Sequence, residues 1–225
     1  MPINSSARRW WLAGLCCAVY ALLWVGWVRD WGWLVSADTS MLAAGWRVGA
    51  DHPAWVTFWD VWCTVFSPVV IRIATVGLIV YALRQRQVRT AVFLVVCVEM
   101  AAVLTELLKR LADRPRPATA MVDALSTSFP SGHALGTMAA ALALGVVCLP
   151  KLRPNLRPWA VAATVVVVLT VGAGRVALNV HHPSDVVAGW AMGYVYFVLC
   201  LLILRGDRTG VTEADETPAM PGSAR

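Results

Sequence analysis

Six long apolar runs dominate this chain of 225 residues and limit what it can fold into. An α-helix needs about 20 apolar residues to cross the hydrocarbon core of a bilayer. Charged residues make up only 14% of the chain, whereas a typical soluble domain has about 25%. We therefore expect an all-α membrane protein, a bundle of six transmembrane helices near Trp10–Val28, Pro68–Leu83, Ala91–Leu108, Ala134–Leu149, Trp159–Ala173 and Val186–Leu204.

The segment from Val35 to Phe66 has a mixed character, because its tryptophans alternate with charged residues such as Asp38 and Asp51. Indole rings favour the boundary between lipid and water, so this mixture predicts amphipathic helices at the interface between the first two spans. The alternative is that the second span is longer and begins near Trp55.

Basic residues beside the spans predict the orientation of the bundle. In a six-span arrangement they fall on one side, in four groups: Arg8 and Arg9; Arg84, Arg86 and Arg89; Lys151, Arg153 and Arg157; Arg205 and Arg208. The positive-inside rule makes this side cytoplasmic, so both termini are expected inside a plasma or inner membrane. We expect a membrane-embedded domain over residues 1–208 and a polar, disordered cytoplasmic tail over 209–225.

The net charge of +6 does not indicate a nucleic-acid partner, because the basic residues lie beside spans and form no continuous face. One cluster stands on the opposite, outer side, after the third span: Lys109, Arg110, Arg114 and Arg116. Charges near lipid are costly unless they serve a function. Contact with lipid headgroups is the alternative, and it suits Arg110 best. Pro115 and Pro117 stiffen the chain around Arg116, which favours forked binding of phosphate oxygens.

A second outer segment, residues 130–133, precedes the fourth span. Ser131 is suited to cap that helix, and the free amides of a helix start bind phosphate. Gly132 permits a close backbone approach, and His133 would point into the same pocket. An ordinary helix cap with no ligand is the alternative.

The third outer segment contains Arg175, His181 and Asp185. The 42 residues between His133 and Arg175 equal about two spans, so both residues are expected on the outer side. Asp185 follows His181 by four residues, close enough to bind one ring nitrogen and direct the other outward, as a nucleophile requires. A purely structural helix cap remains an alternative for this pair.

Metal binding is a competing interpretation of the acidic and histidine residues on this side: His181, His182, Asp185, Asp113 and Asp123. The neighbouring cations would repel a metal ion, whereas a phosphate group would use them. We therefore expect no metal and no other cofactor.

Together, the three segments resemble the motifs of the type-2 phosphatidic acid phosphatase superfamily, which also includes vanadium-dependent haloperoxidases. That pattern is Lys, six residues and Arg-Pro; then Pro-Ser-Gly-His; then Ser-Arg, five residues, His, three residues and Asp. The matching residues, within about Lys109 to Gly189, are Lys109, Arg116, Pro117, residues 130–133, Arg175, His181 and Asp185. Gly174 replaces the usual Ser, which predicts the loss of one hydroxyl contact to phosphate, and His182 stands where Tyr is common.

The resemblance implies a role for each matching residue. His181 would attack phosphorus to form a phosphohistidine, Asp185 would orient it, and His133 would protonate the leaving group and then activate water. The phosphate oxygens would be held by Lys109, Arg116, Ser131, the Gly132 amide and Arg175. No metal is implied.

We therefore predict a lipid phosphatase at the outer leaflet whose partners are its lipid substrate and the bilayer. Polyprenyl diphosphate is the favoured substrate, because an outward site suits a lipid carrier recycled outside the cytoplasm; phosphatidylglycerol phosphate and phosphatidic acid are alternatives. Phosphotransfer from the histidine to another lipid is a second hypothesis. A transporter is less favoured, because the chain has no internal repeat and few polar residues near its spans, chiefly Arg72, Glu99 and Glu106.

Overall fold

The computed structural model describes residues 5–124 and 126–205, and throughout this part the regular structure is helical. Six stretches are long and apolar enough to cross a membrane: Ser6–Val28, Pro53–Arg84, Val88–Ala112, Gly132–Lys151, Pro154–Ala177 and Pro183–Leu204. The chain is a multi-pass membrane protein with six spans, and the predicted all-α bundle is confirmed. The predicted tail over 209–225 lies outside the described residues.

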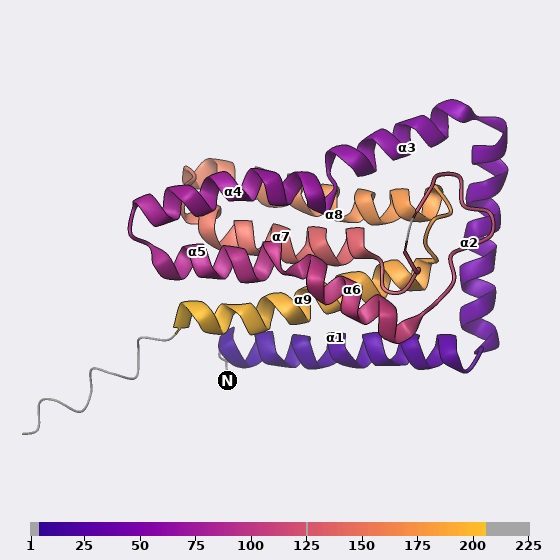
Figure 1. Cartoon of the computed structure of the whole chain (residues 1–225), viewed down its shortest axis with the longest axis horizontal. Coiled ribbons are helices and arrows are strands. Elements are labelled where there is room, and N and C mark those ends of the chain that lie inside the picture. Colours follow the sequence, from indigo (N-terminus) through magenta and orange to yellow (C-terminus); the bar gives the residue numbers. More distant parts are fainter. Residues whose placement is uncertain (1–4, 125, 206–225) are drawn as a thin grey trace, which may run out of the picture.

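Most helices of the bundle run roughly along one direction (Figure 1). They are α1 (Ser5–Val28), α4 (Pro68–Arg84), α5 (Val88–Leu94), α6 (Ala101–Ala112), α7 (Gly132–Cys148), α8 (Arg157–Ala177) and α9 (Pro183–Arg205). Short 3₁₀ turns at Leu149–Lys151 and Pro154–Leu156 connect α7 to α8, and a π-helical turn at Val95–Glu99 joins α5 to α6.

Helices α7 and α9 form the centre of the bundle. Their contact is close because Gly189 of α9 faces the start of α7, where an added Cβ would lie 2.6 Å from the Ser131 carbonyl oxygen. Small residues allow such close helix approach inside membranes. Further along, Phe93, Ala139 and Phe197 belong to the largest group of buried apolar residues, which joins α5, α7 and α9.

The segment between the first two spans forms two helices, α2 (Gly32–Asp51) and α3 (Pro53–Val65). Helix α2 runs across the ends of the other helices, as expected for a helix at the interface (Figure 1). Helix α3 is apolar and joins α4 in the stretch Pro53–Arg84, so here the alternative of a longer second span describes the structure better. The two helices are separate because Ser67 caps α4, its Oγ accepting a bond from Val70 N at 3.3 Å, and Pro68 begins it.

The two ends of the bundle differ in what they hold (Figure 1). One end holds the α4–α5 and α7–α8 connections and the start of α1, with their basic residues. The other end holds α2, the loop after α6 and the α8–α9 turn. Because α7 and α8 run in opposite directions, Arg175 returns to the end that holds His133, as the sequence spacing predicts.

Candidate active site

The start of α7 is fixed by Ser131, which is buried. Its Oγ accepts a hydrogen bond from the Ala134 amide at 3.4 Å, and its own amide donates to the Asp185 carbonyl oxygen at 2.9 Å. Gly132 follows in a tight space, since an added Cβ would lie 3.0 Å from Thr105 Cγ2. The predicted helix cap is therefore present, and it ties the second motif directly to the third.

Lys109 lies in the last turn of α6, and its side chain is almost fully buried. Its ammonium group donates to Ser126 Oγ and to the Thr127 carbonyl oxygen, both at 2.7 Å. Helix α6 ends at Asp113, whose left-handed φ of 46° turns the chain back over Lys109. A cavity of about 220 Å³ is lined at this end by Lys109, Gly132 and His133.

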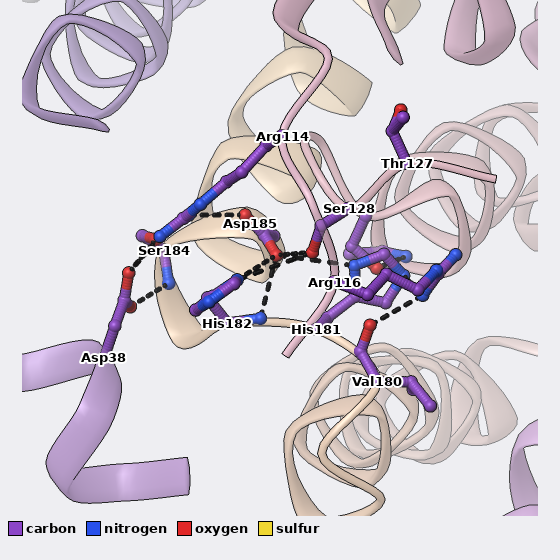
Figure 2. A network of polar contacts seen from close by, with 12 residues as sticks. Asp38, Arg114, Arg116, Thr127, Ser128, Val180, His181, His182, Ser184 and Asp185 are labelled. Atoms are coloured by element: carbon purple, nitrogen blue, oxygen red, sulfur yellow. Dashed lines mark hydrogen bonds and ion pairs between the residues drawn. The ribbon is translucent and has the colours of Figure 1, made fainter. Parts of the chain in front are cut away.

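Arg116 is held in one direction by two backbone carbonyls. Its Nε donates to Ser126 O and its Nη1 donates to Val180 O, each at 2.6 Å, and Nη1 also lies 3.3 Å from His181 Nε2 (Figure 2). Burial and the nearby positive charge of Arg175 lower the pKa of Arg116 to about 10. The group stays charged at neutral pH, so Nη1 can only donate, and His181 Nε2 must then be the unprotonated nitrogen of a neutral ring.

His181 is fully buried in the turn between α8 and α9. Burial is the main cause that lowers its pKa to about 3; the Asp185 carboxylate opposes this shift, and Arg116 and Arg175 add to it. The imidazole is therefore neutral near pH 7. Its Nδ1 lies 3.5 Å from Asp185 Oδ2, so the ring presents Nδ1 to a carboxylate and Nε2 to a cationic group. This is the arrangement expected of a nucleophilic histidine.

Asp185 lies in the first turn of α9 with no exposed surface, and several donors converge on it. Oδ1 accepts from Arg114 Nη1 at 2.6 Å. Oδ2 accepts from the His182 amide at 2.8 Å and from Ser128 Oγ. His182 Nδ1 is nearer to Oδ2 than His181 Nδ1 is, at 3.2 Å against 3.5 Å. Distance to Asp185 therefore does not decide between the two histidines; contact with Arg116 does, because it belongs to His181.

Arg114, which the sequence analysis placed only in the outer group of cations, pairs with two buried carboxylates. Its Nη2 donates to Asp38 Oδ2 at 2.8 Å, while its Nη1 binds Asp185 and Ser184 Oγ (Figure 2). Asp38 also accepts bonds from the Ser184 amide and hydroxyl, at 3.0 Å and 2.6 Å. We call this set the Asp185 cluster: Asp38, Arg114, Ser128, Ser184 and Asp185. It attaches α2 to the start of α9, and the sequence signal for it was one acidic residue in a tryptophan-rich helix.

Arg175 lies in the last turn of α8 with its side chain buried. Its carbonyl oxygen accepts from the amides of Val180 and His181, at 3.2 Å and 3.3 Å, so it shapes the turn that carries His181. Its Nε is buried and has no hydrogen-bond partner among the described residues. A buried donor of this kind is rare, and it is available to a ligand that accepts a hydrogen bond.

Close packing against α3 explains why a glycine, Gly174, precedes Arg175. A Cβ at Gly174 would lie 2.7 Å from Cys63 Sγ and 2.8 Å from Trp59 Cε3, both on α3. Helix α3 thus occupies the space that a serine side chain would need. Glycine at this position lets α3 pack directly against the end of α8.

Ser126 connects the two halves of the site, because it binds Lys109 through its hydroxyl and Arg116 through its carbonyl oxygen. The predicted site residues therefore gather at one end of the bundle. Lys109, Gly132 and His133 line the cavity, and Arg116, His181 and Asp185 are joined by direct contacts. In the described part of the chain, no three His, Cys, Asp or Glu residues form a group that could hold a metal ion.

A family model described as the PAP2 superfamily matches residues 90–208. The chain belongs to the PAP2 superfamily. Two curated proteins are similar to part of the chain: the decaprenylphosphoryl-5-phosphoribose phosphatase of Mycobacterium tuberculosis, 40% identical over 99 residues, and phosphatidylglycerophosphatase B of Bacillus subtilis, 38% identical over 103 residues. These matches cover 42% and 43% of this chain and 50% and 49% of the relatives, so the chain spans about half the length of the curated relatives it matches.

A solved structure is similar over nearly the whole chain. The crystal structure of the transmembrane PAP2-type phosphatidylglycerolphosphate phosphatase from Bacillus subtilis superimposes with a TM-score of 0.75. The match covers 88% of this chain and 98% of the other, at 20% sequence identity. The two proteins therefore share the PAP2 transmembrane fold, including the helices that precede the family match.

Proposed function

We propose that this protein hydrolyses the phosphate ester of a membrane lipid through a phosphohistidine on His181. The observation that carries the proposal is the setting of His181, a buried neutral ring with Nδ1 toward Asp185 and Nε2 beside the Arg116 guanidinium. Arg116 can hold a phosphate oxygen next to the attacking nitrogen. Membership of the PAP2 superfamily supports the same chemistry.

In the first step, His181 Nε2 attacks phosphorus and the bond from phosphorus to the lipid oxygen breaks. His133, at the start of α7, lines the cavity beside Lys109 and gives a proton to the leaving oxygen. A bound phosphate favours the protonated form of a nearby imidazole, so the substrate itself prepares this acid. General acid catalysis of this kind contributes about 10²- to 10⁴-fold.

In the second step, His133 takes a proton from water, and the hydroxide formed attacks the phosphohistidine. The P–N bond breaks and inorganic phosphate leaves, which restores neutral His181. Lys109, Arg116, Arg175 and the start of α7 stabilise the negative charge that develops on the phosphoryl oxygens in both steps. Ser131 contributes by fixing that helix start.

The site is proposed to face the outside of a plasma or inner membrane, with both termini in the cytoplasm. The support is the grouping of basic residues at the end of the bundle opposite the site. In this orientation the lipid tail stays in the bilayer while the phosphate reaches the start of α7.

The proposed substrate carries a terminal phosphate monoester. The names of the two curated relatives describe lipids with such a group, on ribose in one and on glycerol in the other. We favour this class over polyprenyl diphosphate, the substrate that the sequence reasoning preferred. Both classes release inorganic phosphate, so the product does not distinguish them. The rates of release from a panel that contains both kinds of lipid do.

The test is phosphate release by the purified protein, in detergent and with EDTA present, from a panel of lipid phosphates. His181→Ala is expected to abolish release. His182→Ala is the matched control, because His182 also contacts Asp185 yet does not face Arg116; it is expected to keep at least about a tenth of the rate. Reversed effects of the two variants would overturn the nucleophile assignment.

Two further outcomes bear on the reaction itself. Loss of release on adding EDTA would contradict the metal-independent mechanism. A lipid that loses its phosphate without release of inorganic phosphate would contradict hydrolysis and identify phosphotransfer to a second lipid.

A further inference from the structure

The cavity that begins at Lys109 and His133 continues into the bundle between α4, α6 and α7. Its walls are mostly apolar, with Val69, Ala102 and Ala140 among the lining residues. Beyond the phosphate site, two charged side chains break this pattern: Glu106 of α6, which is paired with Arg110 at 3.3 Å, and Arg72 of α4. A charged residue within a membrane span is costly and commonly marks a ligand pathway, so Arg72 needs an explanation.

Arg72 is paired with Glu99, at 3.0 Å between Nε and Oε2. The side chain of Arg72 is 35% exposed and that of Glu99 only 16%. Glu99, at the end of the π-helical turn, is absent from the cavity lining, and its Oε1 is buried with no hydrogen-bond partner among the described residues. Glu99 therefore stands behind Arg72 and orients it. The bond uses one of the five N–H donors of the guanidinium group.

Arg72 lies deeper in the bundle than the phosphate site. Gly136, one helical turn after His133, touches Pro68, since an added Cβ would lie 2.8 Å from Pro68 Cβ. Arg72 is a further turn along α4, so the offset from His133 is roughly 10 Å along the helix axes, at about 1.5 Å per residue.

We propose that Arg72 forms a second anion subsite, which binds the internal phosphodiester of the substrate. This deepens the proposed function and rests on it: the substrate class becomes lipids in which a short polar unit separates a terminal phosphate monoester from a lipid-linked phosphodiester. With the monoester at His181, the phosphodiester lies deeper along the cavity, where the forked donors of an arginine match its oxygens. The apolar walls then receive the start of the lipid chain.

A purely structural role is the competing explanation, since the ion pair also joins α4 to the helix that leads into α6. The two explanations differ in substrate preference. A structural pair affects every substrate alike, whereas an anion subsite affects only substrates that carry the second phosphorus group.

The experiment compares phosphatidylglycerol phosphate with phosphatidic acid of the same acyl chains, in mixed micelles, by phosphate release. The variants are Arg72→Gln and the double variant Arg72→Gln/Glu99→Gln, which avoids leaving a carboxylate unpaired in the bundle. Arg47→Gln is the matched control, because Arg47 is exposed, lies outside the cavity lining and bonds within its own helix, to the Ala43 carbonyl oxygen at 3.3 Å.

We expect the double variant to lose about 10- to 100-fold in kcat/KM on phosphatidylglycerol phosphate, mainly through KM, as for one lost hydrogen bond to a charged group. On phosphatidic acid we expect a change of less than about threefold, because the bond to Arg72 is absent there. Equal losses on both substrates, or no loss on either, would overturn the subsite. A wild-type protein inactive on both lipids would instead overturn the proposed function, and the subsite with it.

Discussion

Two arginines that form ion pairs, Arg114 and Arg72, differ in how tightly they are held. Arg114 bonds to both Asp38 and Asp185, with its side chain 6% exposed and the two carboxylates 3% and 0% exposed. Among the described residues Arg72 bonds to Glu99, and its side chain lines the cavity and is 35% exposed. A side chain bound on several sides can only hold its neighbours in position, whereas one bound on one side can still bind a ligand.

The difference explains how the site combines a fixed catalytic group with a variable substrate. The Asp185 cluster fixes the carboxylate behind His181 and joins three elements, namely α2, the loop after α6 and α9. Near Arg72 the cavity walls are mostly apolar. Under the proposed function, the chemistry depends on the cluster and substrate choice depends on the cavity.

The largest effect is expected from Arg114→Gln. Removing this cation leaves two carboxylates buried without their partner, which costs about 3–5 kcal/mol of stability. The rate of phosphate release should also fall, by about 100-fold, because Asp185 no longer holds His181 in place. Thermal unfolding in detergent and kcat on a terminal phosphate monoester are the two measurements.

The double variant Asp38→Asn/Arg114→Gln separates the two effects. It removes one of the two stranded charges, so stability should recover in part while kcat stays low. A single Arg114→Gln variant with wild-type stability and kcat would show that the cluster does not position Asp185.

The next effect concerns α3, which closes over the same region. Gly174→Ser is expected to destabilise the protein by about 1–3 kcal/mol, because the new side chain meets Cys63 and Trp59. The double variant Gly174→Ser/Cys63→Ala restores space and should regain most of the loss in thermal unfolding. If Gly174→Ser alone left the unfolding midpoint unchanged, α3 would be shown to move aside, unlike the Asp185 cluster.

Much of this arrangement follows from the sequence. Six apolar runs and the basic loops predicted the bundle, and motif spacing predicted that Lys109, His133 and His181 meet at one end. These signals are local, because hydropathy and helix length fix which end of the bundle each motif reaches.

The contacts of Arg114 and Asp38 could not be predicted in the same way. The two residues are 76 positions apart, and their contact depends on how α2 folds across the bundle. Arg114 and Arg116 are both followed by proline, so composition does not show which guanidinium faces Asp185 and which faces His181. Likewise, α3 was predicted less well than α2 because its apolar surface also suits a span.

The pH dependence of stability tests whether the ring of His181 is buried in its neutral form. Folding lowers the pKa of His181 from about 6.5 to about 3, so the unfolded chain binds a proton more readily than the folded one. The contribution of His181 to the free energy of unfolding is therefore complete above pH 6.5. It decreases as the pH drops toward 3, by at most about 1.4 kcal/mol per pH unit.

The measurement is the unfolding midpoint at pH 7.5 and pH 5. The wild type should lose more between the two values than His181→Gln does. His52→Gln, at an exposed histidine, is the control and should behave as the wild type. An equal loss in the wild type and His181→Gln would contradict burial of a neutral ring.

The smallest expected effect, and the most direct test of the opening contrast, is the stability of Arg72→Gln. Its side chain is partly exposed to the cavity, and glutamine keeps one N–H donor for Glu99, so the cost should be about 1 kcal/mol or less. That is several-fold below the cost expected for Arg114→Gln, in the same unfolding assay. A loss as large as that of Arg114→Gln would mean that the Arg72–Glu99 pair holds the bundle together. In that case α4 would be fixed by its ion pair, and substrate preference would have to come from the apolar walls of the cavity.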